Sequence, residues 1–158
     1  MKLDTNYVFP YKIWDGSCKN VKWDGDKLYM TFTRYYIDET LPNEVEVVFH
    51  GVTWIRTTCL NKYPPINDED WADGYITSKP LEEYLLVDRE QFNNDFIPFI
   101  ASDCGWECLR CLTDNVVFID DALFFDCTDI EIVRAECIDY MAKKSRSKRK
   151  CFFGKRRK

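Results

Sequence analysis

Three cysteines lie close together in the segment Cys104-Gly-Trp-Glu-Cys108-Leu-Arg-Cys111. Thiolates separated by three residues and then by two can reach the irons of an iron–sulfur cluster from one loop. Zinc is a second candidate metal, for which Cys127 or His50 would have to supply the fourth ligand. Structural zinc sites usually combine two close pairs of cysteines, and this chain offers one such cluster. A metal-binding protein centred on Cys104, Cys108 and Cys111 is therefore an alternative function rather than the main one.

The simpler interpretation of the eight cysteines is that they are free thiols. A reducing cytosol keeps cysteines reduced, and a buried free cysteine packs as a small hydrophobic residue. Cys59, Cys127 and Cys137 lie within apolar, strand-like runs and fit this interpretation. We therefore expect reduced, metal-free cysteines and no cofactor.

Catalytic chemistry has little support in the sequence. His50 is the only histidine, so any Ser/His or Cys/His pair would have to use it. It follows Phe49 in an expected strand, where an imidazole is more often a hydrogen-bonded rim residue than a general base. Gly-rich phosphate loops and hydrolase motifs do not occur, and Asp120-Asp121 is better explained as a turn than as a glycosidase pair. The chain is therefore not expected to be an enzyme or to bind a small-molecule substrate.

Charge is strongly segregated along the chain. Residues 143–158 contain ten Lys/Arg and no acid, which leaves 12 basic against 27 acidic side chains in residues 1–142. The body therefore has a net charge of −15, although the whole chain carries only −5. Such a body is expected to stay soluble and monomeric by self-repulsion and to attract cationic partners.

The basic tail allows three interpretations. With Phe152 and Phe153 between its two basic runs, it could bind nucleic acid or an anionic membrane. It could instead fold back on the acidic body, or be a flexible, solvated terminus. A nucleic-acid or membrane adaptor acting through the tail is thus a further alternative. Because the acidic body repels polyanions, binding through the tail alone is expected to be weak and salt-sensitive.

Length and composition favour one folded domain. The 158 residues suffice to bury a core without metals or disulfides, and 46% hydrophobic residues are too many for a disordered body. Lys2, Asp4 and Lys12 interrupt the N-terminus, so we expect no signal peptide. No run approaches the ~18 apolar residues of a membrane helix. We expect a single acidic domain over residues 1–142, a tail over residues 143–158, and a cytoplasmic location.

Alternating hydrophobicity predicts strands in the first part of the chain. Asp24-Gly25 is a turn signal between residues 21–23 and 27–33, which predicts a hairpin. Residues 44–49 alternate as a second strand, and Gly51 is expected to form a bulge that re-aims residues 52–57. The side chains expected on one face of the hairpin's second strand are those of Leu28, Met30 and Phe32.

The second part predicts one or two short helices around residues 78–98, followed by more strands. Ser78 is a candidate cap for a helix over residues 80–85, and residues 91–99 are a second helix candidate. Residues 116–125 predict a hairpin or one long strand. Residues 130–141 fit a helical stripe behind a Thr128-x-x-Glu131 capping box, but their β-branched residues favour a strand. The expected fold is α+β, mainly β: an antiparallel sheet arranged as a sandwich or half-barrel.

Four segments resemble small bacterial immunity proteins of polymorphic toxin systems. They are the hairpin Val21–Phe32, the strand region Val45–Ile55, and the closing segments Phe118–Cys127 and Ile130–Ala135. Proteins of this kind are compact acidic partners that block a toxin delivered by a neighbouring cell. The resemblance implies a cytoplasmic protein that binds and neutralises a cognate toxin, and it assigns no functional residue.

An acidic segment with one aromatic residue is the candidate binding surface. Trp71 stands among Asp68, Glu69, Asp70 and Asp73. Carboxylates mimic a polyanion and steer association with the positive cleft of a nuclease-like toxin, and a desolvated aromatic ring supplies a hot spot. The alternative is a solvated loop whose Trp71 turns inward. The main expectation is a toxin inhibitor, monomeric when free, that binds no nucleic acid through its body.

Overall fold

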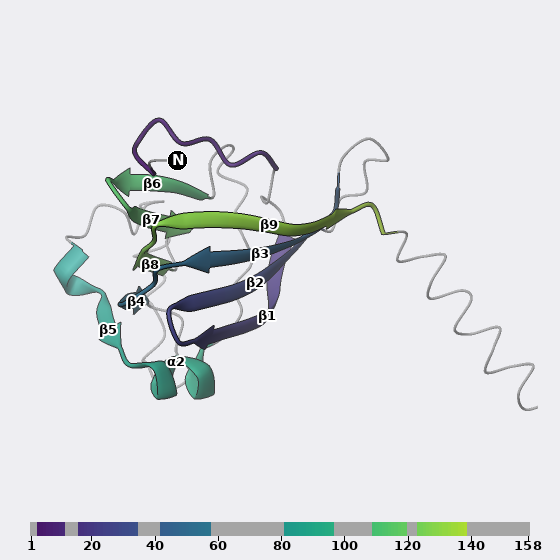
Figure 1. The fold of residues 1–158 in the computed structure, drawn as a ribbon. Coiled ribbons are helices and arrows are strands. Elements are labelled where there is room, and N and C mark those ends of the chain that lie inside the picture. The colour runs from purple at the N-terminus through teal and green to yellow at the C-terminus, as the bar shows by residue number, and fades with distance from the viewer. Residues whose placement is uncertain are drawn as a thin grey trace, which may run out of the picture.

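Two antiparallel sheets make up most of the structure, a computed structural model that describes residues 3–11, 16–34, 42–57, 81–96, 109–119 and 123–138 (Figure 1). The four-stranded sheet has the order β1-β2-β3-β9 and consists of β1 (Gly16–Asp24), β2 (Lys27–Arg34), β3 (Glu44–His50) and β9 (Asp129–Glu136). The five-stranded sheet has the order β5-β4-β8-β7-β6 and consists of β4 (Ile55–Thr57), β5 (Leu85–Val87), β6 (Leu109–Thr113), β7 (Val116–Ile119) and β8 (Leu123–Asp126). The expected mainly β, antiparallel fold is confirmed.

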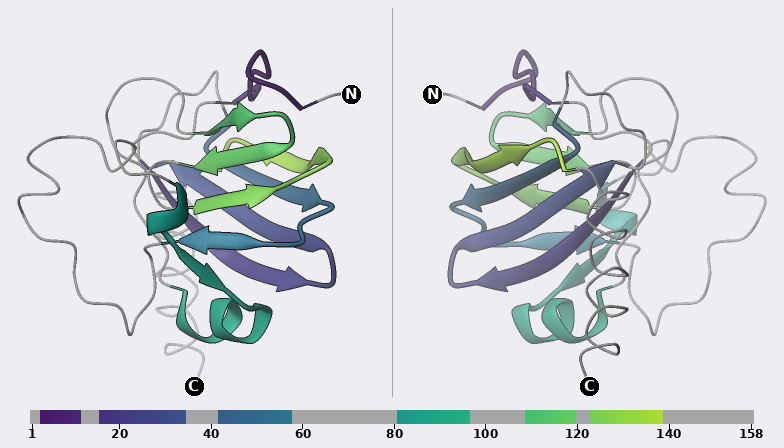
Figure 2. Two further views of the ribbon diagram at one scale, coloured as in Figure 1. Left: turned by 90° about the vertical axis from the view of Figure 1, so that its left-hand side faces the viewer. Right: turned by 90° about the vertical axis from the view of Figure 1, so that its right-hand side faces the viewer.

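The sheets stack face to face and enclose one core, which makes the architecture a sandwich rather than a half-barrel (Figure 2). Leu28, Met30 and Phe32 of β2 point inward as expected, in register with Phe49, Val47 and Val45 of β3. The second sheet contributes Ile55, Val117, Ile119, Leu123 and Phe125. The rings of Phe49 and Phe125, from opposite sheets, form an edge-to-face contact with centroids 4.8 Å apart. Burying each large apolar side chain of this kind contributes about 1.5–3 kcal/mol.

The link after β3 carries the chain from one sheet to the other. Gly51 has a φ of +75°, a backbone conformation that residues with a Cβ rarely adopt, and the chain turns there toward β4. Asp126 at the end of β8 holds the link: its Oδ1 accepts the N–H groups of Thr53 at 2.6 Å and Trp54 at 3.0 Å. Its Oδ2 accepts a hydrogen bond from the Thr53 hydroxyl. The chain changes direction at Gly51 as expected, but the expected bulge is wrong: β3 ends at His50, and residues 51–54 cross to β4, which begins at Ile55.

Local signals located most of the remaining elements. The hairpin β1–β2 turns at Gly25, β7 and β8 form the second hairpin, and residues 129–136 are a strand. The helix expected over residues 91–99 is α2 (Arg89–Asp95), whose N-cap Asp88 accepts a hydrogen bond from the Gln91 N–H at 2.7 Å. It is the single α-helix among the described residues, and no described helix has the length and hydropathy to span a bilayer.

The helix expected over residues 80–85 is wrong for its described part. Leu81–Glu83 is a single 3₁₀ turn, η2, and the chain continues as β5. Leu85 and Val87 pair with Thr57 and Ile55 of β4. The ladder hydrogen bonds and core contacts of this pairing override a weak local helix preference. The helix cap predicted at Thr128 is wrong as well. The Thr128 N–H donates to the His50 carbonyl at 2.8 Å, and the chain continues from Thr128 into β9.

The outer face of the five-stranded sheet is apolar over β7 and β8. Phe118 and Phe124 point away from the main core, yet they are only 3% and 4% exposed. Tyr84 packs on Phe124 with ring centroids 4.5 Å apart, and Trp54 and Leu81 join the same cluster. The runs Val-Val-Phe-Ile and Leu-Phe-Phe lack polar alternation because both faces of these strands are covered.

Two asparagine side chains substitute for missing strand partners. The Asn93 amide of α2 accepts the Trp23 N–H at 2.8 Å and donates to the Trp23 carbonyl at 2.9 Å, which fixes the helix to β1. The Asn43 amide accepts the Ile138 N–H at 2.7 Å and donates to the Ile138 carbonyl at 2.6 Å. Each amide presents one donor and one acceptor, so it satisfies the backbone as a neighbouring strand would.

Candidate functional site

The outer face of the four-stranded sheet is the polar face of the sandwich. Glu44 and Glu46 alternate along β3 with the core residues Val45 and Val47 and therefore point outward. β9 pairs with this strand and brings Arg134 opposite Glu46. Charged side chains from distant parts of the chain thus meet on one surface.

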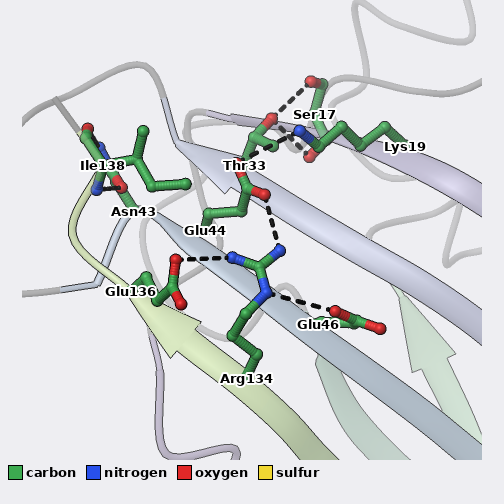
Figure 3. Close-up of polar contacts among 9 residues, drawn as sticks. All are labelled: Ser17, Lys19, Thr33, Asn43, Glu44, Glu46, Arg134, Glu136 and Ile138. Carbon is green, nitrogen blue, oxygen red and sulfur yellow. Dashed lines mark hydrogen bonds and ion pairs between the residues drawn. The ribbon is translucent and has the colours of Figure 1, made fainter. Parts of the chain in front are cut away.

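Arg134 binds three carboxylates at this surface (Figure 3). Its Nη2 lies 2.8 Å from Glu44 Oε1, its Nε 3.3 Å from Glu46 Oε2, and its Nη1 3.0 Å from Glu136 Oε2. Glu44 also accepts a hydrogen bond from Lys19 Nζ of β1 at 3.2 Å. We call these five residues the Arg134 cluster. It ties strands β1, β3 and β9 together across the sheet.

The Arg134 cluster keeps an excess of negative charge. The hydrogen bond with Glu44, reinforced by Glu46 and Glu136 against an opposing effect of burial, raises the pKa of Arg134 above its usual value. The guanidinium is therefore permanently charged, and three carboxylates face two cations. Ion pairs at surfaces contribute little to stability because water and salt screen them. The Arg134 cluster therefore matters less for stability than as a carboxylate-rich surface that already binds one guanidinium.

An open hollow of about 420 Å³ adjoins the cluster and shares Glu46 with it. Its other lining residues are Asn20, Lys22, Asp24, Tyr29, Met30 and Thr31. It lies at a β-bulge, because the pairing of β1 with β2 shifts register between Lys19 and Lys22. Asn20 in this bulge has a φ of +54°, an uncommon conformation for a residue with a side chain. Bulges of this kind re-aim side chains and are frequent beside binding sites.

His50 lies at the rim of the same face, as the sequence suggested. Its Nε2 is 2.8 Å from Glu131 Oε1. Glu131 is about half exposed, and its carboxylate is the only side-chain partner of the ring among the described residues. This pair is a surface contact between β3 and β9.

The described thiols separate into buried and exposed groups. Cys18, Cys111 and Cys127 are buried, whereas Cys137 is exposed, which corrects the expectation that it packs in the core. Cys137 lies just beyond the end of β9 at Glu136, where the apolar spacing in the sequence has no core to face. Burial raises the pKa of Cys127 to about 12, although its Sγ donates a hydrogen bond to the Asp129 carbonyl. These are properties of inert structural thiols.

Alkylation should distinguish these thiols. Reagents such as iodoacetamide attack the thiolate, so at pH 9 Cys137 should react at least roughly 100-fold faster than Cys127 in the folded protein. The folded pKa of Cys127, about 12, lies above its ordinary 9.0. The neutral thiol therefore stabilises the fold below about pH 9, and this contribution is lost as the pH rises toward 12. Peptide mass spectrometry measures both rates, and equal labelling in urea is the control. Equal rates in the native protein would contradict the burial of Cys127.

Most of the sequence-predicted site residues lie outside the described residues. This applies to Asp68, Glu69, Asp70, Trp71 and Asp73 of the acidic segment, to Cys104 and Cys108, and to the tail. Cys111 is described and lies on β6 facing the core. Within the described ranges, no group of three or more His, Cys, Asp or Glu residues is placed to hold a metal ion.

Sequence reasoning missed the Arg134 cluster and the hollow. The alternation Glu44-Val-Glu46-Val places both glutamates on one face, which was a usable signal. No local signal pairs β3 with β9, since about 90 residues separate Glu44 from Arg134. Comparisons of the chain with protein-family models, with curated proteins and with solved structures found no match.

Proposed function

We propose that this chain is a cytoplasmic immunity-type protein that binds a cationic protein toxin, such as a nuclease, and neutralises it. The charge distribution carries the proposal: residues 1–142 contain 12 basic and 27 acidic side chains. An acidic body of this kind attracts a positive substrate cleft and competes with the polyanion that the cleft normally binds. The chain then acts as an inhibitor by occupation and needs no catalytic group of its own.

The proposal assigns two kinds of surface to the partner. The first is the acidic segment with Asp68, Glu69, Asp70, Trp71 and Asp73, in which carboxylates steer the encounter and the indole supplies a desolvated anchor. The second is the surface of the Arg134 cluster, whose excess carboxylate adds to the negative field of the body. Charge complementarity mainly accelerates association, whereas buried contacts set the lifetime of a complex.

Salt should slow association with the toxin far more than dissociation. The probe is the product of a toxin gene adjacent to the gene of this chain, studied by stopped-flow fluorescence. Between 50 mM and 500 mM NaCl we expect the association rate constant to fall by about tenfold or more and the dissociation rate constant to change less than about threefold. A salt-independent association rate would contradict electrostatic steering. If no adjacent toxin binds, the proposed function is wrong.

Neutralising the acidic segment locates the surface in the same experiment. Replacing Asp68, Glu69, Asp70 and Asp73 by Asn or Gln should lower the association rate, and Trp71→Ala should raise the dissociation rate by roughly 30-fold, the equivalent of about 2 kcal/mol. Glu82→Gln with Glu83→Gln is a control that removes exposed charge on η2. Circular dichroism must show that each variant folds. Full protection of cells by the segment variants would mean that the toxin binds elsewhere.

A further inference from the structure

We propose that the hollow on the outer face of the four-stranded sheet binds an arginine side chain of the cationic partner. The inference deepens the proposed function and rests on it for the identity of the partner. It concerns the cavity lined by Asn20, Lys22, Asp24, Tyr29, Met30, Thr31 and Glu46. The volume of about 420 Å³ lies within the range of small ligand sites, and a guanidinium with its aliphatic stem is a small ligand.

Two residues that line this hollow have hydrogen-bonding atoms that no described residue uses. Thr31 is only 3% exposed, and its hydroxyl has no hydrogen-bond partner in the described part of the chain. A hydroxyl oxygen that no described residue engages is available to accept a hydrogen bond from an incoming donor. Glu46 uses Oε2 for Arg134, and its Oε1 makes no hydrogen bond to any described residue. Asp24 adds a second carboxylate at the rim.

The chemistry of these groups selects a guanidinium. The acceptors are two carboxylates and a hydroxyl, and Tyr29 also lines the hollow. Arginine combines several donors in one plane with a face that stacks on aromatic rings, whereas lysine is a point charge. Lys22 is the only cation among the described lining residues, and its exposed side chain can turn toward solvent.

The Arg134 cluster is an internal example of the same recognition. There the carboxylates of Glu44, Glu46 and Glu136 hold a guanidinium at 2.8–3.3 Å. The cluster retains one negative charge after Lys19 is counted, and Glu46 belongs to both sites. A second guanidinium in the hollow would neutralise this excess.

Titration of the full-length, ¹⁵N-labelled chain with acetyl-tetraarginine amide tests the site by NMR. Shift changes should concentrate on the amides of Asn20, Tyr29, Thr31 and Glu46 and saturate with a Kd on the order of 1 mM. Thr31→Val keeps the shape and removes the hydroxyl, so it should weaken binding by about fivefold. Glu131→Gln removes a carboxylate of the same face that does not line the hollow, and it should change the Kd by less than about twofold.

Several results would overturn the inference. One is a set of non-saturating shifts spread over exposed acids such as Glu82, Glu83 and Glu90, which would indicate diffuse charge attraction. Another is an unchanged Kd in Thr31→Val. If serine replacements of the basic residues in 143–158 shift the hollow amides before peptide is added, the chain's own tail is the occupant rather than a partner.

The outcome is separable from the proposed function. With an identified toxin, equal affinity for the parent and Thr31→Val would eliminate the hollow as a contact and leave the inhibitor function standing. Saturable peptide binding in the hollow without any toxin partner would support an arginine site and remove the immunity function.

Discussion

Gly51→Ala should destabilise the fold by about 2–4 kcal/mol. Gly51 has a φ of +75°, which costs a residue with a Cβ about 1–2 kcal/mol. A Cβ at this position would also lie 2.8 Å from Thr128 Cγ2 and 3.1 Å from Thr128 Cβ. Thr128 cannot yield freely, because its N–H is bonded to the His50 carbonyl at 2.8 Å. Urea unfolding at 25 °C, followed by circular dichroism, measures the loss.

Gly25→Ala is the matched control. Gly25 has a similar φ of +60° in the β1–β2 turn, but a Cβ added there would meet nothing within 4 Å. Only the backbone strain applies, so we expect a loss of about 1 kcal/mol. The difference between the two variants then isolates the contact with Thr128. Equal losses would show that the close approach at the sheet crossing does not matter.

Asp126→Ala should cost about 2–3 kcal/mol. The substitution removes the acceptor for two backbone N–H groups, those of Thr53 and Trp54, and for the Thr53 hydroxyl. Hydrogen bonds to a charged carboxylate are stronger than those between neutral groups. Without the carboxylate, the N–H donors are left poorly satisfied where the chain crosses between the sheets. Loss of the link should also loosen Trp54 from the outer cluster, so its tryptophan fluorescence should shift to longer wavelength. Equilibrium unfolding gives the change in free energy.

Two milder variants bracket this prediction. Thr53→Val removes only the hydroxyl bond, and we expect a loss of about 0.5–1 kcal/mol. Asp126→Asn keeps one acceptor oxygen without the charge and should fall between the two. If Thr53→Val is as costly as Asp126→Ala, the backbone N–H bonds contribute nothing and the proposed role of the carboxylate is wrong.

Local sequence patterns were sufficient to locate most strands and to identify the core-facing side chains of β2 and β3. Period-2 alternation in β2 and β3 identified Leu28, Met30, Phe32 and their partners, because a strand with one buried face has to alternate. Glycines marked two changes of chain direction, the β1–β2 hairpin at Gly25 and the crossing between sheets at Gly51, because both occupy positive-φ positions that most residues avoid. The acid-rich body was likewise determined by composition alone.

Tertiary structure alone decided which strands pair and which polar groups meet. Leu85–Val87 became a strand because β4 offered it a ladder, and the Arg134 cluster exists because β9 lies beside β3. The hollow requires the register shift in β1. The hydrogen bonds from the Asn43 and Asn93 amides require backbone partners about 70 to 95 residues away. Local propensities act over a few residues, whereas these contacts depend on non-local pairing that many sequence patterns would permit. The surface chemistry was therefore specified only when the two sheets had formed.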